Sequence, residues 1–157
     1  MTPEQKATLK THILATQDLA DLYTAGNLNG LAEALNTDAT PAFVVWRRSI
    51  PSMEMGKTVI YDALAAMTTA NTSRVSLFME LNSESFDGSA DLDAYFADTF
   101  GGALNGQGAN CRAALAAMLR RNATRYEEVF AVGTGSTNTP ATLVLEGPLP
   151  WTDLIGM

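Results

Sequence analysis

The chain has 157 residues, a length that fits one domain able to bury about two-thirds of the surface of its unfolded form. Its 17 acidic and 10 basic residues give a net charge of −7, which argues against a general nucleic-acid-binding protein. The single cysteine, Cys111, excludes an internal disulfide and is expected to be a small buried side chain. No run of about 18 apolar residues is present, so we expect no membrane segment. The opening residues carry no apolar run, and we expect no signal peptide.

Three short helices are predicted within the first 36 residues. The stretch Thr2–Gln5 combines an N-cap, a first-turn proline and a capping-box glutamine, and it begins a helix that continues to about Ala15. Thr16 can cap a second helix that Gly26 stops, and Asn27 can cap a third. We expect these helices to form a compact cap.

The middle of the chain is predicted to be mostly helical. The apolar run Phe43–Trp46 fits either a buried strand or a helix, and we favour the helix slightly because Thr40-Pro41 can start one. Trp46 is interpreted as a core anchor or, alternatively, as an interface residue. Further helical stretches and a glycine-rich loop then follow in chain order: Met53–Met55, Val59–Met67, Val75–Leu81, Asp91–Phe100 and the loop Gly101–Gly108.

One long amphipathic helix is predicted from Asn110 to Phe130, because apolar residues recur there at spacings of three and four. Four arginines crowd this helix. They form either a solvated face with local ion pairs or a basic face that meets an acidic partner, a neighbouring subunit or DNA. These arginines are Arg112, Arg120, Arg121 and Arg125.

The C-terminal part is predicted to be a turn followed by a strand. Gly133–Pro140 cannot continue a helix, and Ala141–Glu146 is apolar and β-branched enough for a strand. Val129–Val132 can pair with it as a hairpin. Because a lone hairpin is marginal in water, it must pack on the helices or join a neighbouring subunit's strand.

No catalytic, metal or cofactor site is predicted from the residue pattern. The only histidine, His12, has no obvious nucleophilic partner in the sequence. Gly133–Thr137 lacks the lysine and the following helix of a phosphate loop. An EF-hand-like spacing of acidic residues fails because Leu92 stands where the loop needs glycine. That spacing comprises Asp87, Ser89, Asp91, Asp93 and Asp98.

Several segments together resemble a family of small structural proteins of tailed bacteriophages, and the resemblance covers most of the chain. The segments are Met1–Lys10, Pro41-Ala42-Phe43-Val44-Val45-Trp46-Arg47-Arg48-Ser49, Leu64–Asn71, Asn122-Ala123-Thr124-Arg125, Val129–Gly135 and Pro140–Leu149.

The resemblance implies a non-enzymatic virion protein, made in the bacterial host cytoplasm and located in the neck. The best-fitting role is a head–tail connector that forms a homo-oligomeric ring beneath the portal protein and contacts adjacent neck or tail proteins. Other virion parts (tail completion or minor head proteins) and a host-interaction module remain alternatives, with a hydrolase last. By analogy with such adaptors, a C-terminal arm docks on the portal through Thr142, Leu143, Val144, Leu145 and Trp151.

Acidic residues of the connector could line its channel and repel passing DNA. The candidate channel-lining residues are Glu84, Asp87, Asp91 and Asp93. Overall we predict a mainly α, single compact domain over residues 1–157, with a helical body (1–130) and a C-terminal hairpin or strand with a docking tail (131–157). Deleting Ala141–Met157 is then expected to leave a folded protein that no longer joins the portal ring.

Overall fold

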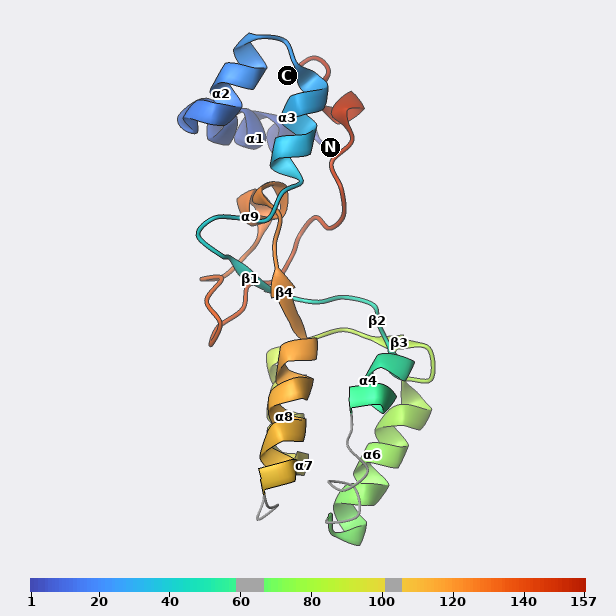
Figure 1. The fold of residues 1–157 in the computed structure, drawn as a ribbon. Coiled ribbons are helices and arrows are strands. Elements are labelled where there is room, and N and C mark those ends of the chain that lie inside the picture. The colour runs from blue at the N-terminus through green and yellow to red at the C-terminus, as the bar shows by residue number, and fades with distance from the viewer. Residues whose placement is uncertain (59–66, 101–105) are drawn as a thin grey trace. The chain divides into compact units, whose positions relative to one another are not determined.

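The computed structural model describes residues 1–58, 67–100 and 106–157. Within these ranges the protein is mainly helical, with eight α-helices, one 3-10 helix and four short strands in two two-stranded sheets (Figure 1). The mainly α prediction is therefore confirmed.

The described residues form two compact units. Unit 1 comprises residues 1–45 and 122–157, and unit 2 comprises residues 46–121. The chain leaves unit 1 within strand β1 (Val44–Trp46) and returns to it within strand β4 (Arg120–Asn122).

The expected division of the chain differs from the observed one. The single domain stays a prediction, but residues 131–157 are not a separate tail after a body of residues 1–130. They belong to unit 1 together with the N-terminal helices. The reason is that Leu143, Leu149 and Leu154 are buried in unit 1, each at 2% exposure or less.

The three N-terminal helices lie where the capping signals place them. They are α1 (Pro3–Ala15), α2 (Gln17–Thr24) and α3 (Leu28–Leu35). The capping box at Thr2 is complete, since Thr2 Oγ1 accepts from the Gln5 N–H and Gln5 Oε1 accepts from the Thr2 N–H. Thr16 precedes α2 but does not cap it, because its hydroxyl donates to the His12 carbonyl instead.

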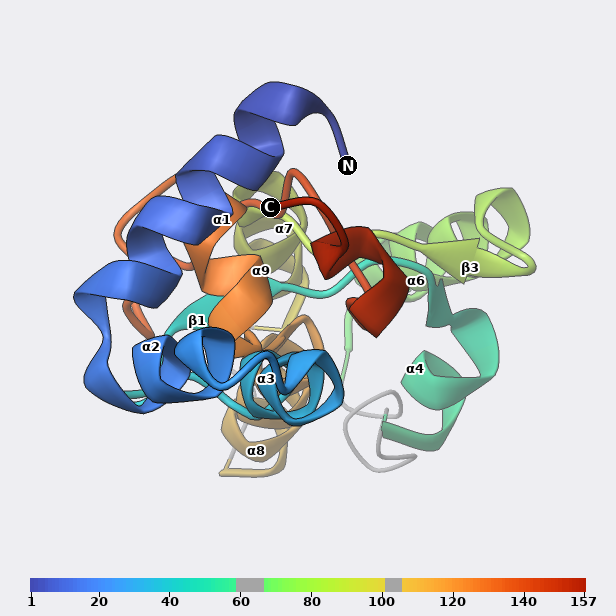
Figure 2. The same ribbon diagram turned by 90° about the horizontal axis from the view of Figure 1, so that it is seen from above.

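The main core of unit 1 joins these helices to the C-terminal part of the chain. Helix α9 (Arg125–Phe130) lies against α1 and α3 (Figure 2), and the 3-10 helix η1 (Trp151–Leu154) lies against α3. Burying each large aliphatic side chain contributes about 1.5–3 kcal/mol. The buried residues of this core are Leu9, Ile13, Leu19, Leu31, Ala32, Leu35, Tyr126, Leu149 and Leu154.

The run Phe43–Trp46 contains a strand, and the slight preference for a helix was wrong. Its backbone bonds to segments distant in the sequence: the Val44 N–H donates to the Gly135 carbonyl, and the Ala141 N–H donates to the Val44 carbonyl. Gly135 is required there because its φ is +65° and a Cβ would lie 2.3 Å from the Phe43 ring. A small second core results, formed by Val45, Ala123, Ala141 and Leu143.

The single long helix predicted from Asn110 to Phe130 was also wrong. The region contains helix α8 (Gly106–Met118), strand β4 and helix α9. Thr124 begins the last helix with a complete capping box, in which it exchanges bonds with Glu127. Because α8 begins at Gly106, the predicted loop up to Gly108 ends earlier than expected.

The C-terminal hairpin is reduced to a single pair of residues. Val132 and Thr142 form an antiparallel bridge with two backbone hydrogen bonds of 2.9 Å, and Ala141 forms a parallel bridge with Val45. The predicted strand Ala141–Glu146 does not extend beyond these bridges. Ala141 and Leu143 are buried in unit 1, whereas Val144 is exposed.

Unit 2 contains helices α4 (Ser52–Thr58), α6 (Thr69–Leu81), α7 (Ala90–Phe100) and α8, and strand β2 (Ile50–Pro51) pairs antiparallel with β3 (Ser85–Phe86). Its core is rich in aromatic rings, with Phe78 packed edge-on against both Phe86 and Phe96. Its buried residues are Ile50, Met55, Val75, Phe86, Phe96, Phe100, Cys111, Leu115, Met118 and Leu119.

The helical stretches predicted at Met53–Met55, Val75–Leu81 and Asp91–Phe100 are present with shifted ends, as α4, α6 and α7. Thr68 caps α6 by accepting from the Asn71 N–H, so the expected interruption at 68–71 is the first turn of this helix. Residues 59–66 of the predicted helix Val59–Met67 lie outside the described residues. Cys111 is fully buried, as expected.

Candidate docking surfaces

The structure separates the five residues predicted to dock on a portal. Leu143 is 1% exposed and belongs to a core of unit 1, and Leu145 is half-buried beside the main core of that unit. Thr142 is tied to Val132 by the bridge. Only Val144 and Trp151 present large apolar side chains to solvent, at 55% and 46% exposure.

Two polar side chains hold the C-terminal segment on unit 1. Asn36 makes two hydrogen bonds to the Leu149 backbone: its Oδ1 accepts from the N–H at 2.8 Å, and its Nδ2 donates to the carbonyl at 3.0 Å. The buried Glu127 accepts from the Gly147 N–H at 3.1 Å. Sequence reasoning missed both residues, although the pattern Thr124-x-x-Glu127 is a recognisable capping box.

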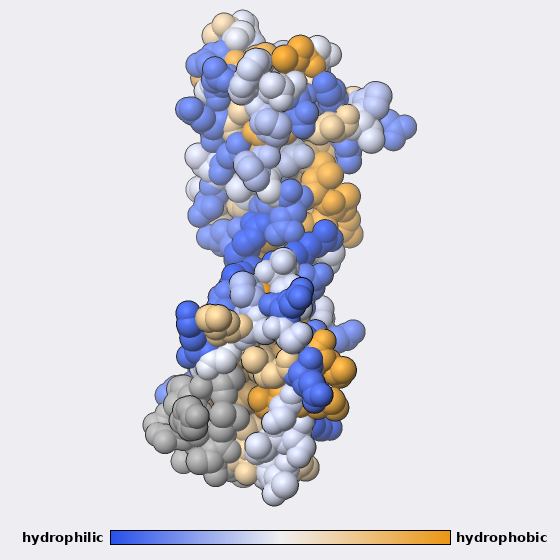
Figure 3. Space-filling view, turned by 90° about the vertical axis from the view of Figure 1, so that its right-hand side faces the viewer, coloured by the Kyte–Doolittle hydropathy of each residue, from blue (hydrophilic) through white to orange (hydrophobic). Residues whose placement is uncertain are grey.

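Large apolar side chains reach the surface of unit 1, as the orange areas of its visible face illustrate (Figure 3). From Ala141 to Val144 burial alternates, so Leu143 points inward while Thr142 and Val144 point outward. Val132, 67% exposed, is bridged to Thr142. Val132 is therefore bridged to a segment whose next residue, Leu143, is buried and whose following residue, Val144, is exposed.

The four arginines predicted to share a face lie on different elements. Arg120 Nη2 is 2.6 Å from Asp93 Oδ2, and its guanidinium lies over the Trp46 ring in unit 2. Arg125 pairs with Asp18 in unit 1, whereas Arg121 lies in β4 and also has a partner. Arg112 is exposed on α8. The four arginines therefore do not share the face of one helix, because β4 interrupts the predicted helix, and their role between subunits stays a prediction.

The ion pair between Arg125 and Asp18 should have a measurable effect on the titration of the Asp18 carboxyl. The side-chain hydrogen bonds from Arg125 hold the pKa of the Asp18 carboxyl below its ordinary value of 3.8, and the charge of Arg125 adds to this effect. Because the folded-state pKa is lowered, the pair stabilises the protein above that ordinary value and loses this contribution as pH falls through the lowered pKa. Since Asp18 is well exposed, we expect less than about 1 kcal/mol from it.

Substituting Arg125→Gln should raise the pKa of Asp18 toward its ordinary value in an NMR titration. The matched control is Arg74→Gln, because Arg74 pairs with Asp98 in unit 2 and should leave the Asp18 titration unchanged. An unaltered Asp18 titration in Arg125→Gln would contradict the assignment.

Two of the four acidic residues proposed to line a channel have structural roles in unit 2. Asp93 pairs with Arg120, and Asp87 Oδ1 accepts from the Ser49 N–H at 2.8 Å. Glu84 and Asp91 are exposed. Among residues 1–58, 67–100 and 106–157, no group of three or more histidine, cysteine or acidic side chains is arranged to hold a metal ion.

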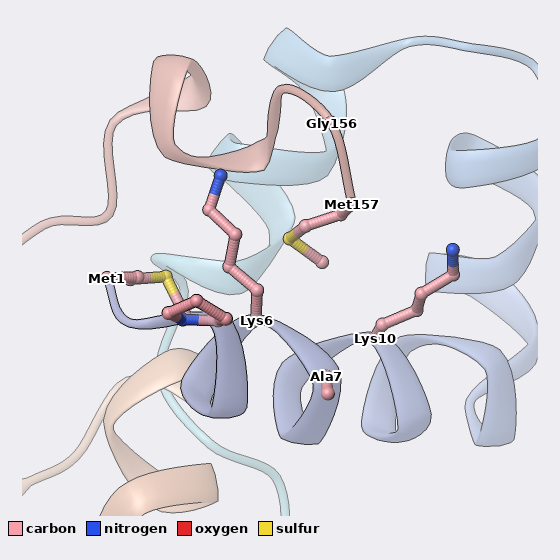
Figure 4. A pocket seen from close by; sticks show the side chains of 7 residues that line it. Met1, Lys6, Ala7, Lys10, Gly156 and Met157 are labelled. Atoms are coloured by element: carbon pink, nitrogen blue, oxygen red, sulfur yellow. The ribbon is translucent and has the colours of Figure 1, made fainter.

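A hollow of about 460 Å³ lies on unit 1 between α1 and the last residues of the chain (Figure 4). Lys6 and Lys10 rise from the same side of α1, with the Met157 side chain between them. Lys6 Nζ donates to the Ile155 carbonyl at 2.9 Å, and Lys10 Nζ lies 5.4 Å from the centre of the Tyr23 ring. The four-residue spacing of the lysines is the sequence signal that could have indicated this site.

Comparison with known proteins gives no relative: no family model, no curated protein and no solved structure matches the chain. In the described part of the chain, none of the helices has the length and apolar character needed to cross a bilayer.

Proposed function

We propose that this chain is a structural protein of a tailed bacteriophage, a head–tail connector that assembles as a ring beneath the portal in the neck of the virion. The sequence segments that resemble this family support the proposal, and so does the mainly helical fold. Its partners are further copies of itself, the portal protein and the adjacent neck or tail proteins.

The observation that carries the proposal is the C-terminal segment. Its backbone is held to unit 1 by Asn36 and Glu127, and Leu143 anchors it in a core. From this fixed backbone, Val144 and Trp151 project into solvent. Rigidly presented apolar and aromatic side chains are typical of interface anchors, because little conformational entropy is lost when they bind.

The docking surface is therefore smaller than the sequence indicates. It is reduced to the exposed side chains of Val144 and Trp151, and it excludes the buried Leu143. The exposed Val132 is bridged to Thr142, two residues before Val144. The exposed Asp91 remains a candidate for lining a channel through which DNA passes, since its charge would repel the phosphate backbone.

The test is co-purification with the portal protein of the same virion. Val144→Asp should reduce portal recovery by at least about tenfold, because an acidic group would be desolvated at the interface. The matched control is Leu14→Asp, at another exposed apolar position of unit 1. Both variants should keep the wild-type circular dichroism spectrum and melting temperature.

Undiminished portal recovery by Val144→Asp would overturn the docking surface. Immunogold labelling of purified virions tests the location independently, and the gold should lie at the junction of head and tail. A protein absent from the virion would overturn the proposed function.

A further inference from the structure

Two surfaces of this molecule are complementary in charge, and each also presents apolar side chains. One is the hollow on unit 1, which has apolar walls and carries Lys6 and Lys10. The other is the exposed end of α6 in unit 2, where Leu77, Glu80 and Leu81 share one side of the helix.

The hollow on unit 1 is both basic and apolar. Met1, Pro3 and Met157 contribute its apolar lining. In the described part of the chain neither Lys6 nor Lys10 pairs with a carboxylate: one ammonium bonds a carbonyl and the other lies over an aromatic ring. Both retain donors for an incoming acidic group, since an ammonium carries three. The surface therefore suits a segment that is apolar and acidic at once.

The end of α6 has this character. Leu81 is 74% exposed and Leu77 is 54% exposed, four residues apart on one face. Glu80 lies between them in sequence and Glu84 follows the helix, and both are exposed. Within the described ranges neither glutamate forms an ion pair with a basic side chain.

We infer that the end of α6 of one copy of this chain docks in the Lys6–Lys10 hollow of a second copy. Leu81 enters between the apolar walls, and Glu80 and Glu84 pair with the two lysines. A hollow of about 460 Å³ is large enough to admit a leucine side chain. Charge complementarity of this kind sets the register of an interface and suppresses wrong partners.

The contact joins two different surfaces, so it is heterologous. Such a contact leaves one hollow and one α6 end free in every dimer, and repetition yields a closed ring or an open filament. The inference rests on the proposed ring-forming connector and deepens it by naming the contact between neighbouring subunits.

Disulfide trapping tests the contact directly. Met157→Cys and Leu81→Cys are purified separately, mixed and oxidised gently, and a mixed disulfide should form because the two positions come within bonding range. Thr69→Cys, at the opposite end of α6, is the matched control and should not pair with Met157→Cys. The native Cys111 is fully buried, and the wild-type chain measures its background.

Three outcomes would overturn the inference. The first is a mixed disulfide no more abundant than in the Thr69→Cys control. The second is a predominant disulfide between two copies of Leu81→Cys, which indicates a two-fold contact between identical surfaces. The third is a wild-type chain that stays monomeric at every concentration in analytical ultracentrifugation.

Charge reversal provides the second measurement. The double variants Lys6→Glu/Lys10→Glu and Glu80→Lys/Glu84→Lys should each weaken self-association by about tenfold or more, and mixing them should restore it. Val144→Asp, which alters the surface proposed for the portal, should self-associate like the wild type. Failure of the mixture to recover association would overturn the pairing.

The two proposals can fail separately. A chain that self-associates through this contact but is absent from virions would refute the connector function and leave the contact standing. If the protein is found in the virion neck but its assembly is unchanged by these substitutions, the contact alone would be refuted.

Discussion

Deleting Ala141–Met157 is expected to unfold unit 1, in contrast to the detachable arm that the sequence suggests. The deletion removes Leu143, Leu149 and Leu154, each at 2% exposure or less, from the cores of this unit. A single buried Leu→Ala change costs about 2–5 kcal/mol. Three such losses together approach the whole stability of a typical domain, about 5–15 kcal/mol.

Hydrogen exchange followed by mass spectrometry checks this expectation. Amides of α1, α3 and α9 should lose their protection in the truncated chain, because the segment that covers them is absent. The control is the double variant Val144→Ala/Trp151→Ala, which shortens only exposed side chains of the same segment and should keep that protection. A truncated chain with fully protected N-terminal helices would contradict the structure-based expectation and restore the arm.

The substitution Glu127→Ala is expected to have the largest effect of any single change of a charged side chain in unit 1. Glu127 is 2% exposed, and its carboxylate accepts from the Thr124 N–H at 2.9 Å and from the Gly147 N–H at 3.1 Å. Losing the capping box costs about 1 kcal/mol, and each buried donor left unpaired costs about 1–3 kcal/mol. We therefore expect a loss of about 3–5 kcal/mol in the free energy of unfolding.

Urea denaturation measures the effect of this change. Glu127→Gln should fall between the wild type and Glu127→Ala, because a neutral amide oxygen accepts more weakly than a carboxylate. The neighbouring Glu128 provides the control, since the Thr124 capping box does not use it. Glu128→Ala should change stability by less than about 1 kcal/mol. Equal losses in Glu127→Ala and Glu128→Ala would contradict the role given to Glu127.

The sequence predicts the N-terminal helices well because their signals are local. A capping box at Thr2 or an Asn27 cap involves residues three positions apart, so the pattern contains the whole interaction. The helix over Asp91–Phe100 is likewise recovered, as α7, from the spacing of its apolar residues. The burial of Cys111 followed from the chemistry of the residue alone.

The candidate site was predicted less well. Of the five docking residues, Val144 and Trp151 are exposed while Leu143 is a core residue. The sequence could not distinguish them, because an apolar residue in a strand-like run looks the same whether it faces the core or solvent. The hollow at Lys6 and Lys10 was not predicted, since two of its seven lining residues, Gly156 and Met157, come from the other end of the chain.

By itself, then, the sequence determined the helical class and the helix starts that depend on side-chain caps. The tertiary structure alone decided that Val44–Trp46 is a strand, that the apolar run after Asn110 breaks at β4, and that the C-terminal residues belong to unit 1. In each of these cases the backbone or side-chain partner lies tens of residues away. Local periodicity carries no information about such partners, whereas packing and long-range hydrogen bonds select among the local conformations that the sequence permits.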